Sequence, residues 1–324
     1  MSPLLRALAL ALSFIVASAS AWAQQPKAIP IVGLMSFVAA SDDPAYDAFR
    51  QGLRELGYLE GRNVRIEFRN ALGHADRLPG LAEELVRLKP DVIVLGNPIA
   101  ARAVMRASST TPIVIVASDP LGSGLVTNLA HPGGNLTGLS TITTELGAKR
   151  LQLLKETIPG LNRLAVLWHQ LSTIDKRVDE LKAAAASLSI ELKVVKAQAP
   201  EEFSAAFAEF RQARVQALYL IESPLFYGHR RTLAAMALHA RLPTMYSTKV
   251  FPADGGLMSY GADFQVLARQ AAGYVDKILK GAKPGDLPIE QATKLEFVIN
   301  LKTAKGLNLM IPPSVLTRAD EIIR

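Results

Sequence analysis

Short runs of apolar, mostly β-branched residues alternate with longer amphipathic segments from Ile29 almost to the end of the chain. Within the short runs the apolar residues are continuous rather than alternating with polar ones. This pattern is typical of parallel strands that helices cover on both faces. It predicts strands over residues 30–35, 64–68, 92–95, 113–117, 164–168, 190–195, 217–221, 244–246, 257–260 and 295–299.

The longer segments carry apolar residues three and four positions apart, as expected for helices with one buried face. Strands that alternate with such helices form an open α/β sheet with right-handed crossovers. The periodicity is clearest at Leu78, Leu81, Ala82, Leu85 and Val86, and again at Phe264, Leu267, Ala268, Ala271, Tyr274, Val275 and Ile278.

The strand spacing repeats along the chain. Four strands begin near residues 30, 64, 92 and 113, and four more near 164, 190, 217 and 244, on either side of a break at 133–144. The third strand of each set is followed by a polar residue and a proline, Asn97-Pro98 and Ser223-Pro224. The repeat predicts an α/β protein of two doubly wound, Rossmann-like lobes.

The C-terminal strands and helices complete both lobes rather than forming a third domain. The chain would then cross between the lobes three times, near residues 140–145, 251–256 and 280–288. We expect lobe 1 to comprise residues 28–140 and 256–281, and lobe 2 to comprise residues 141–255 and 282–324.

The first residues form a separate segment. Arg6 supplies a positive start, an apolar run extends from Leu8 to Ala17, and Ala21-Trp22-Ala23 gives a small-x-small ending. The run is shorter than the about 20 residues that a membrane span requires. These features predict a secretory signal peptide over residues 1–23, cleaved before Gln24. The chain has no cysteine, so we expect no thiol-linked lipid anchor on the exported protein.

The composition makes several other classes unfavourable. The formal net charge is +7, but lysine and arginine are spread along the chain rather than gathered into the basic face of a nucleic-acid-binding protein. No metalloprotease, serine-hydrolase or P-loop motif occurs. Gly122-Ser123-Gly124 begins like a dinucleotide fingerprint, but Thr127 replaces the third glycine. We therefore expect no enzyme activity and no cofactor. We also expect no metal, because the histidines have no paired spacing: His74, His131, His169, His229 and His239.

The loops at the carboxyl ends of the strands are the expected binding site, because ligands of open α/β sheets bind there. Asn97, Ser223 and Asp119 each precede a proline, which predicts helix caps whose free N–H groups would suit a carboxylate. Aromatic rings and hydroxyl groups dominate the same loops. The candidate ligand-binding residues are Ser36, Phe37, Asn97, Ser118, Asp119, Thr141, Trp168, His169, Ser223, Phe226, Tyr246, Tyr260 and Asp263.

The charge of these loops indicates the kind of ligand. Arginines are scarce in them, which disfavours phosphate and dicarboxylate ligands and favours a neutral or zwitterionic one. Asp119 or Asp263 could pair with a ligand ammonium group, or could cap the helix that follows.

Several stretches resemble one family, the substrate-binding proteins of ABC transporters with the type I periplasmic fold, in the group that includes tryptophan-binding proteins. The stretches are QGLRELGY at 51–58, SDP at 118–120, HPGGNLTG at 131–138 and GGLMSYG at 255–261. The resemblance implies two lobes that close on a ligand about a hinge of three crossovers, like a Venus flytrap. It also implies a periplasmic location and delivery of a small molecule, such as an amino acid, to an ABC permease and its ATPase at the inner membrane.

Our hypothesis is a soluble monomer that binds a small molecule and neither inserts in a membrane nor binds nucleic acid. Asn97, Ser118 and Ser223 would orient the polar part of the ligand. Its apolar body would be covered by Phe37, Trp168, Phe226, Tyr246 and Tyr260. Three alternatives are a secreted α/β enzyme, a repressor-type regulator and a module that signals ligand binding to a membrane receptor. The regulator would need a DNA-binding helix pair where this chain has its expected signal peptide.

Overall fold

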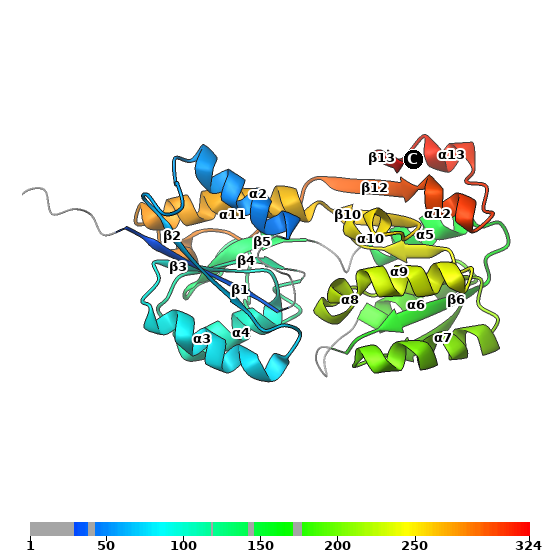
Figure 1. The fold of residues 1–324 in the computed structure, drawn as a ribbon, viewed down its shortest axis with the longest axis horizontal. Coiled ribbons are helices and arrows are strands. Elements are labelled where there is room, and N and C mark those ends of the chain that lie inside the picture. The colour runs from blue at the N-terminus through cyan, green and yellow to red at the C-terminus, as the bar shows by residue number, and fades with distance from the viewer. Residues whose placement is uncertain (1–28, 38–42, 118, 142–145, 171–176) are drawn as a thin grey trace, which may run out of the picture.

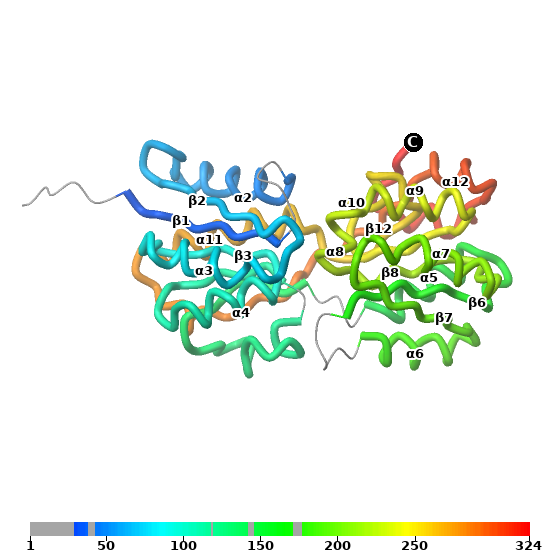
Figure 2. Tube along the Cα trace, turned by 60° about the horizontal axis from the view of Figure 1, so that its bottom comes forward, coloured from blue at the N-terminus to red at the C-terminus, as the bar shows by residue number. Residues whose placement is uncertain are grey.

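The computed structural model describes residues 29–37, 43–117, 119–141, 146–170 and 177–324. The expected signal peptide, residues 1–23, lies outside this part of the chain. The described strands form two sheets, each at the centre of an α/β lobe, and the two lobes lie side by side in both views (Figures 1 and 2). The prediction of two doubly wound α/β lobes is confirmed.

The sheet of lobe 1 has six strands in the order β11-β5-β4-β3-β1-β2, all parallel. Its strands are β1 (Ile31–Ser36), β2 (Arg65–Asn70), β3 (Val92–Leu95), β4 (Ile113–Ala117), β5 (Leu136–Ser140) and β11 (Glu290–Gln291). One face packs against α2 (Pro44–Glu55) and α11 (Phe264–Leu279), and the other against α3 (Leu78–Arg87) and α4 (Pro98–Ala107). In Figure 1 the orange α11 lies beside the blue α2, although the two are far apart in sequence.

The sheet of lobe 2 has seven strands in the order β13-β12-β10-β9-β8-β6-β7. They are β6 (Arg163–Trp168), β7 (Glu191–Lys196), β8 (Ala217–Leu220), β9 (Thr244–Tyr246), β10 (Met258–Ala262), β12 (Leu295–Asn300) and β13 (Glu321–Ile323). All neighbouring pairs are parallel except β10 with β12. The sheet of lobe 2 is therefore mixed, whereas the apolar runs predict only parallel strands.

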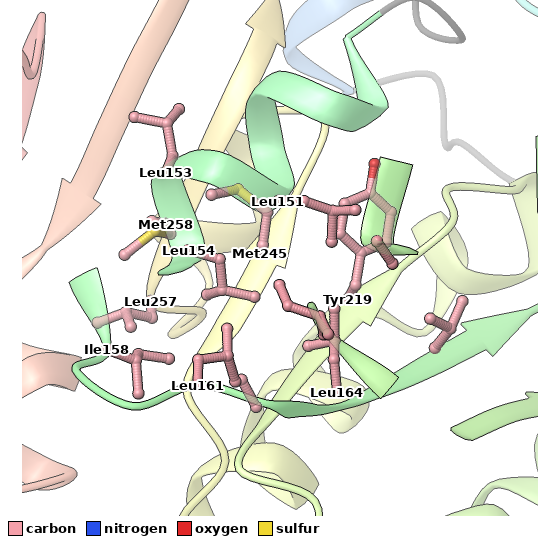
Figure 3. Packing of buried hydrophobic residues seen from close by; sticks show 14 of the residues in the cluster. Leu151, Leu153, Leu154, Ile158, Leu161, Leu164, Tyr219, Met245, Leu257 and Met258 are labelled. Carbon is pink, nitrogen blue, oxygen red and sulfur yellow. The ribbon is translucent and has the colours of Figure 1, made fainter. Parts of the chain in front are cut away.

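Helices cover both faces of the second sheet. On one face lie α5 (Gly147–Thr157), α6 (Arg177–Ser187), α12 (Leu301–Gly306) and α13 (Pro313–Leu316). Figure 3 shows leucines of α5 packed against side chains of the strands, among them Leu164, Tyr219 and Met245. The other face packs against α7 (Phe203–Gln212), α8 (Pro224–Gly228), α9 (Arg230–His239) and α10 (Val250–Ala253).

The two sheets repeat the same winding. In the first sheet β2, β1, β3, β4 and β5 are neighbours in that order, and in the second β7, β6, β8, β9 and β10 follow the same pattern. Each half therefore contributes five strands. The fifth strand of the first half, β5, occupies part of the segment that the spacing predicts as a break at 133–144.

Strand pairing places the crossovers differently from the ranges expected above. β10 pairs with β9 and β12 of lobe 2, and only after Ala262 does the chain enter α11 of lobe 1. It stays in lobe 1 through β11, where the Tyr274 hydroxyl donates to the carbonyl of Pro288 at 2.9 Å, and returns to lobe 2 at β12. An apolar run at 257–260 suits either sheet, and only the long-range pairing decides between them.

Among the described residues, we find no helix with the length and apolar character that crossing a membrane requires.

Candidate ligand-binding site

A cavity of about 670 Å³ lies between the two lobes and is lined by both. Its wall includes the carboxyl ends of β1, β3 and β4 from lobe 1 and of β8 from lobe 2. In each sheet the winding reverses beside these strands, between β1 and β3 and between β6 and β8. This is where open α/β sheets bind ligands, and the volume is typical of small-molecule sites.

Five of the predicted residues line this cavity: Ser36, Phe37, Asn97, Asp119 and Ser223. The side chain of Asn97 accepts a hydrogen bond from the Ala100 N–H at 2.9 Å and caps α4, as its position before a proline predicts. Ser223 caps α8 in the same way, by accepting from the Phe226 N–H at 3.3 Å. Two of the three expected caps are therefore present.

Asp119 does not cap a helix. Its backbone has a φ of 42°, in the left-handed region, and its carboxylate accepts from the Gly122 N–H at 2.7 Å. Turns rather than a helix follow it in the described structure. Asp119 therefore belongs to a tight loop on the cavity wall. Ser118, its predicted neighbour in the site, lies outside the described residues.

Three predicted aromatic residues pack into lobe 2 instead of lining the cavity. Phe226 is fully buried and contacts Phe203, with ring centroids 5.9 Å apart. Tyr246 stacks on Phe251 at 4.4 Å, and Tyr260 makes an edge contact with Phe297 at 6.3 Å. Tyr246 and Tyr260 lie on strands, whose side chains alternate between two faces, so their rings can point into the core. Phe226 lies on the face of α8 that packs against the core of lobe 2.

The remaining predicted residues that the structure describes are not among those that line the cavity. Trp168 packs against the core of lobe 2, and His169 lies against the ring of Phe226. Thr141 is fully buried next to Ser140. Asp263 accepts from the first N–H groups of α11 and bonds to Lys249 Nζ at 2.8 Å, so of its two proposed roles it has that of a helix cap.

The sequence predicts few arginines at the site, but the structure places two there, both from helices of lobe 2. Arg150 is 3% exposed, and its guanidinium donates to the Tyr260 carbonyl at 2.6 Å and to the Tyr219 hydroxyl at 3.3 Å. Arg177 donates to the backbone carbonyl of Glu222 at 2.9 Å. The strand-end loops do not indicate either arginine, because α5 and α6 carry them.

Glu222 follows β8 and places a carboxylate among these groups. The hydroxyl of Ser247 donates to it. Burial raises the pKa of Glu222, while the hydrogen bond from Ser247 and the charges of Arg150 and Arg177 act in the opposite direction. With Glu180 on the same wall, lobe 2 presents charges of both signs to the cavity.

Lobe 1 supplies a largely apolar wall. Burial raises the pKa of Tyr46 to about 12, although a hydrogen bond with Ser36 opposes the shift, so its hydroxyl stays neutral. Such a wall can cover a ring or an alkyl group. The large apolar and aromatic side chains that line it are Phe37, Tyr46, Phe49, Val94, Leu95, Ile99, Val116, Leu121, Leu129 and Phe264.

A hydrogen bond between side chains joins the lobes at the cavity. The hydroxyl of Tyr227, on α8 of lobe 2, donates to the carboxylate of Asp43, at the start of α2 in lobe 1, over 2.7 Å. Both residues line the cavity. In the described part of the chain, histidine, aspartate and glutamate form no group of three or more that could hold a metal ion.

Comparison with known proteins gives several relatives of nearly the same length. The chain is 27% identical over 269 residues to the tyrosine-binding protein of Clostridioides difficile strain R20291, covering 82% of this chain and 77% of that one. A structure from Streptococcus pneumonia of an ABC domain in complex with L-Trp superposes with a TM-score of 0.84 at 27% identity, covering 91% of this chain and 99% of that one.

A crystal structure of a conserved domain protein from Vibrio cholerae superposes with a TM-score of 0.82 at 30% identity, again covering 91% of this chain and 99% of that one. The family model described as ABC transporter substrate binding protein matches residues 31–323, almost all of the described chain. This family consists of solute-binding proteins and not of enzymes. The chain belongs to the ABC transporter substrate-binding proteins.

Proposed function

We propose that this protein captures an amino acid with an aromatic or large apolar side chain in the cavity between its lobes and delivers it to an ABC importer. The observation that carries the proposal is the combination, in one cavity, of side chains of both charges with an extended apolar wall. A zwitterion with an apolar body matches both features, whereas a sugar or an inorganic anion matches only one.

The charged wall supports the zwitterionic part. Arg150 and Arg177 are suited to a carboxylate, and Glu222 and Asp119 to an ammonium group. The capped start of α4 at Asn97 adds backbone N–H groups on the opposite side of the cavity. A ligand that bridges these groups would contact both lobes.

The relatives support the apolar part. The relative from Clostridioides difficile is named a tyrosine-binding protein, and the Streptococcus pneumonia structure contains L-Trp. The apolar wall of lobe 1 includes the rings of Phe37, Tyr46 and Phe264, which could pack against the ring of such a ligand.

The position of the cavity between two separate sheets supports binding by closure. A ligand that contacts both lobes stabilises the closed arrangement by its differential affinity for the two states. On strand pairing we propose lobe 1 as residues 29–140 and 263–292, and lobe 2 as 146–262 and 295–324. We further propose a periplasmic location after signal-peptide cleavage, and an inner-membrane permease with its ATPase as the recipient of the ligand.

A ligand screen tests this function. The protein from Gln24 onward is mixed with each of the twenty common amino acids and with tryptamine and indole-3-propionate, and its thermal unfolding is followed. A ligand that binds only the folded protein adds about 2.7 kcal/mol of stability at a hundredfold excess over Kd, which raises the Tm by several degrees.

We expect L-tryptophan or L-tyrosine to raise the Tm most. Tryptamine lacks the carboxylate and indole-3-propionate lacks the ammonium group, so each should give a smaller shift. The proposal is wrong if no amino acid changes the Tm, or if the acid without an ammonium group binds as well as the amino acid.

A further inference from the structure

We propose that Tyr227 and Asp43 form a latch between the lobes, which makes Tyr227 a positioning residue that holds the protein closed around its ligand. This inference rests on the proposed function, because it explains how binding in the cavity is converted into closure. The geometry of the two residues and of the helices that carry them supports this role.

Asp43 is fixed by its own lobe. One carboxylate oxygen accepts from the Ala45 N–H at 3.0 Å and caps α2, while the other accepts the Tyr227 hydroxyl at 2.7 Å. The residue is 8% exposed. The cap sets the direction of the second oxygen, so the acceptor is already oriented before the lobes meet.

Tyr227 is fixed by lobe 2. The Arg230 guanidinium lies 4.9 Å from the centre of its ring and donates to its backbone carbonyl at 3.1 Å. Arg230 is itself held by Asp254, at 2.6 Å. Burial and the neighbouring Asp43 raise the pKa of Tyr227, so the hydroxyl remains a donor throughout the neutral range.

The same helices contact the ligand cavity. α8 follows directly on Glu222 and Ser223, which line the cavity, and Tyr227 lies near the other end of this short helix. In α2 the residues after Asp43, among them Tyr46, also line the cavity. A ligand that contacts the starts of α8 and α2 therefore sets the positions of the donor and the acceptor of the latch.

The latch biases an equilibrium rather than locking it, because water can satisfy both groups once the lobes separate. Replacing Tyr227 by phenylalanine would leave the Asp43 carboxylate largely buried in the closed form without its donor. A hydrogen bond to a charged group of this kind corresponds to about a tenfold or larger change in an equilibrium constant. Most of this change should appear in the rate of ligand release.

The test compares Tyr227→Phe, Asp43→Ser and the double variant. Serine still caps a helix but is too short to reach Tyr227. With L-tryptophan and L-tyrosine as probes, stopped-flow fluorescence and calorimetry should show about tenfold weaker binding for each single variant and faster release. The double variant should bind no more weakly than the weaker of the two singles, because both remove the same interaction.

Tyr58→Phe is the matched control. The Tyr58 hydroxyl also donates to an aspartate, Asp276, at 3.0 Å, but both residues lie in lobe 1. This variant should lower the Tm and leave the affinity unchanged. The latch is refuted if Tyr227→Phe binds and releases both probes like the unchanged protein, if the two single losses add, or if Tyr58→Phe loses as much affinity.

Small-angle X-ray scattering separates failure of the latch from failure of the proposed function. If neither amino acid binds the unchanged protein, the proposed ligand class is wrong. The scattering of the ligand-free proteins is then the only test of the latch. Loss of the latch should give Tyr227→Phe a larger radius of gyration than the unchanged protein and Tyr58→Phe, and an equal radius in all three refutes it.

Discussion

Glu222 is a carboxylate at the end of a buried strand, on the wall of a cavity that also holds two arginines. Burial raises its pKa, and the Ser247 hydroxyl and the charges of Arg150 and Arg177 only partly offset this effect. The ionised form of Glu222 is therefore less favourable in the folded protein than in the unfolded chain. A ligand ammonium group beside it would remove that penalty. Glu222 therefore lowers the stability of the fold but favours binding of the ligand.

Glu222→Gln should stabilise the ligand-free protein at neutral pH and not under acid conditions. The folded-state pKa of Glu222 lies above its ordinary value of 4.5. The stabilising effect of its protonated form is therefore complete below that value and is lost as the pH rises through the folded-state pKa. Glutamine does not titrate, so the Tm of the variant should exceed that of the unchanged protein at pH 7 to 8, with the difference vanishing near pH 4. A Tm difference that is constant with pH would contradict this assignment.

At the residue scale, the sequence predicts what depends on near neighbours. Asn97 and Ser223 cap helices because a short polar side chain before a proline is a local signal. The cavity-facing roles of Arg150 and Arg177 were missed, because which face of a helix meets the cleft depends on how the lobes pack. For the same reason the sequence places the ring of Phe226, three residues after Ser223, in the site, whereas the structure places it in the core.

At the scale of elements, strand β10 packs against the cavity wall and ends at Ala262, where the chain crosses to lobe 1. A Cβ atom at Gly261 would overlap with the Ser247 carbonyl oxygen and would lie 3.2 Å from a guanidinium nitrogen of Arg150. The Ser247 hydroxyl in turn donates a hydrogen bond to the carboxylate of Glu222. The absence of a side chain at Gly261 therefore lets β10 pack closely against two groups of the cavity wall.

Gly261→Ala should both destabilise the fold and weaken ligand binding. The added methyl group must displace backbone at Ser247, and overpacking of this kind costs about 1–3 kcal/mol. Gly273→Ala is the matched control, because nothing lies within 4 Å of its Cβ position in α11 and alanine favours a helix interior by about 0.5–1 kcal/mol. Chemical denaturation and calorimetry with L-tryptophan measure both effects. Equal behaviour of the two variants would exclude this role for Gly261.

The strands predicted best are buried ones whose sequence contains no Thr-Gly interruption. β3, β4 and β9 have the bounds that their apolar runs predict. β5 was missed because Thr137 and Gly138 interrupt its apolar pattern directly after a Gly-Gly turn. β11 and β13 have two and three residues, and partly exposed segments this short become strands only by pairing with distant neighbours.

At the scale of the molecule, one crossover leaves lobe 2 at β10 and the next returns to it at β12, the neighbouring strand. β10 and β12 pair up to Ala262 and Leu295, the last residues before the chain passes to lobe 1 and the first after it returns. The strand repeat predicts two lobes and three crossovers, but it contains no information about which strands pair where the chain crosses between the lobes. That information lies in contacts between residues more than thirty positions apart.

Lys249 bonds to a carboxylate at each of these crossovers. Its ammonium group lies 2.8 Å from Asp263, which caps α11, and 3.2 Å from Glu296 on β12. Burial opposes ionisation of Asp263, but Lys249 and two backbone N–H groups outweigh it and hold the pKa of Asp263 below its ordinary value. Burial and the charge of Asp263 raise the pKa of Glu296, because the two acids share one cation.

Lys249→Met should therefore destabilise the protein in a pH-dependent way. Asp263 has a lowered folded-state pKa, so its contribution is present at neutral pH and is lost as the pH falls. We expect a loss of about 1–3 kcal/mol at pH 7, between the values typical of exposed and buried pairs, and a smaller loss near pH 3.

Adding Glu296→Gln should recover part of the loss by removing the repulsion between the acids. Lys280→Met, which breaks a surface pair with Asp276, should change stability by less than about 0.5 kcal/mol. Denaturant unfolding at both pH values measures all four proteins. If Lys249→Met is as stable as Lys280→Met, or if Glu296→Gln recovers nothing, Lys249 does not fasten the two crossovers together.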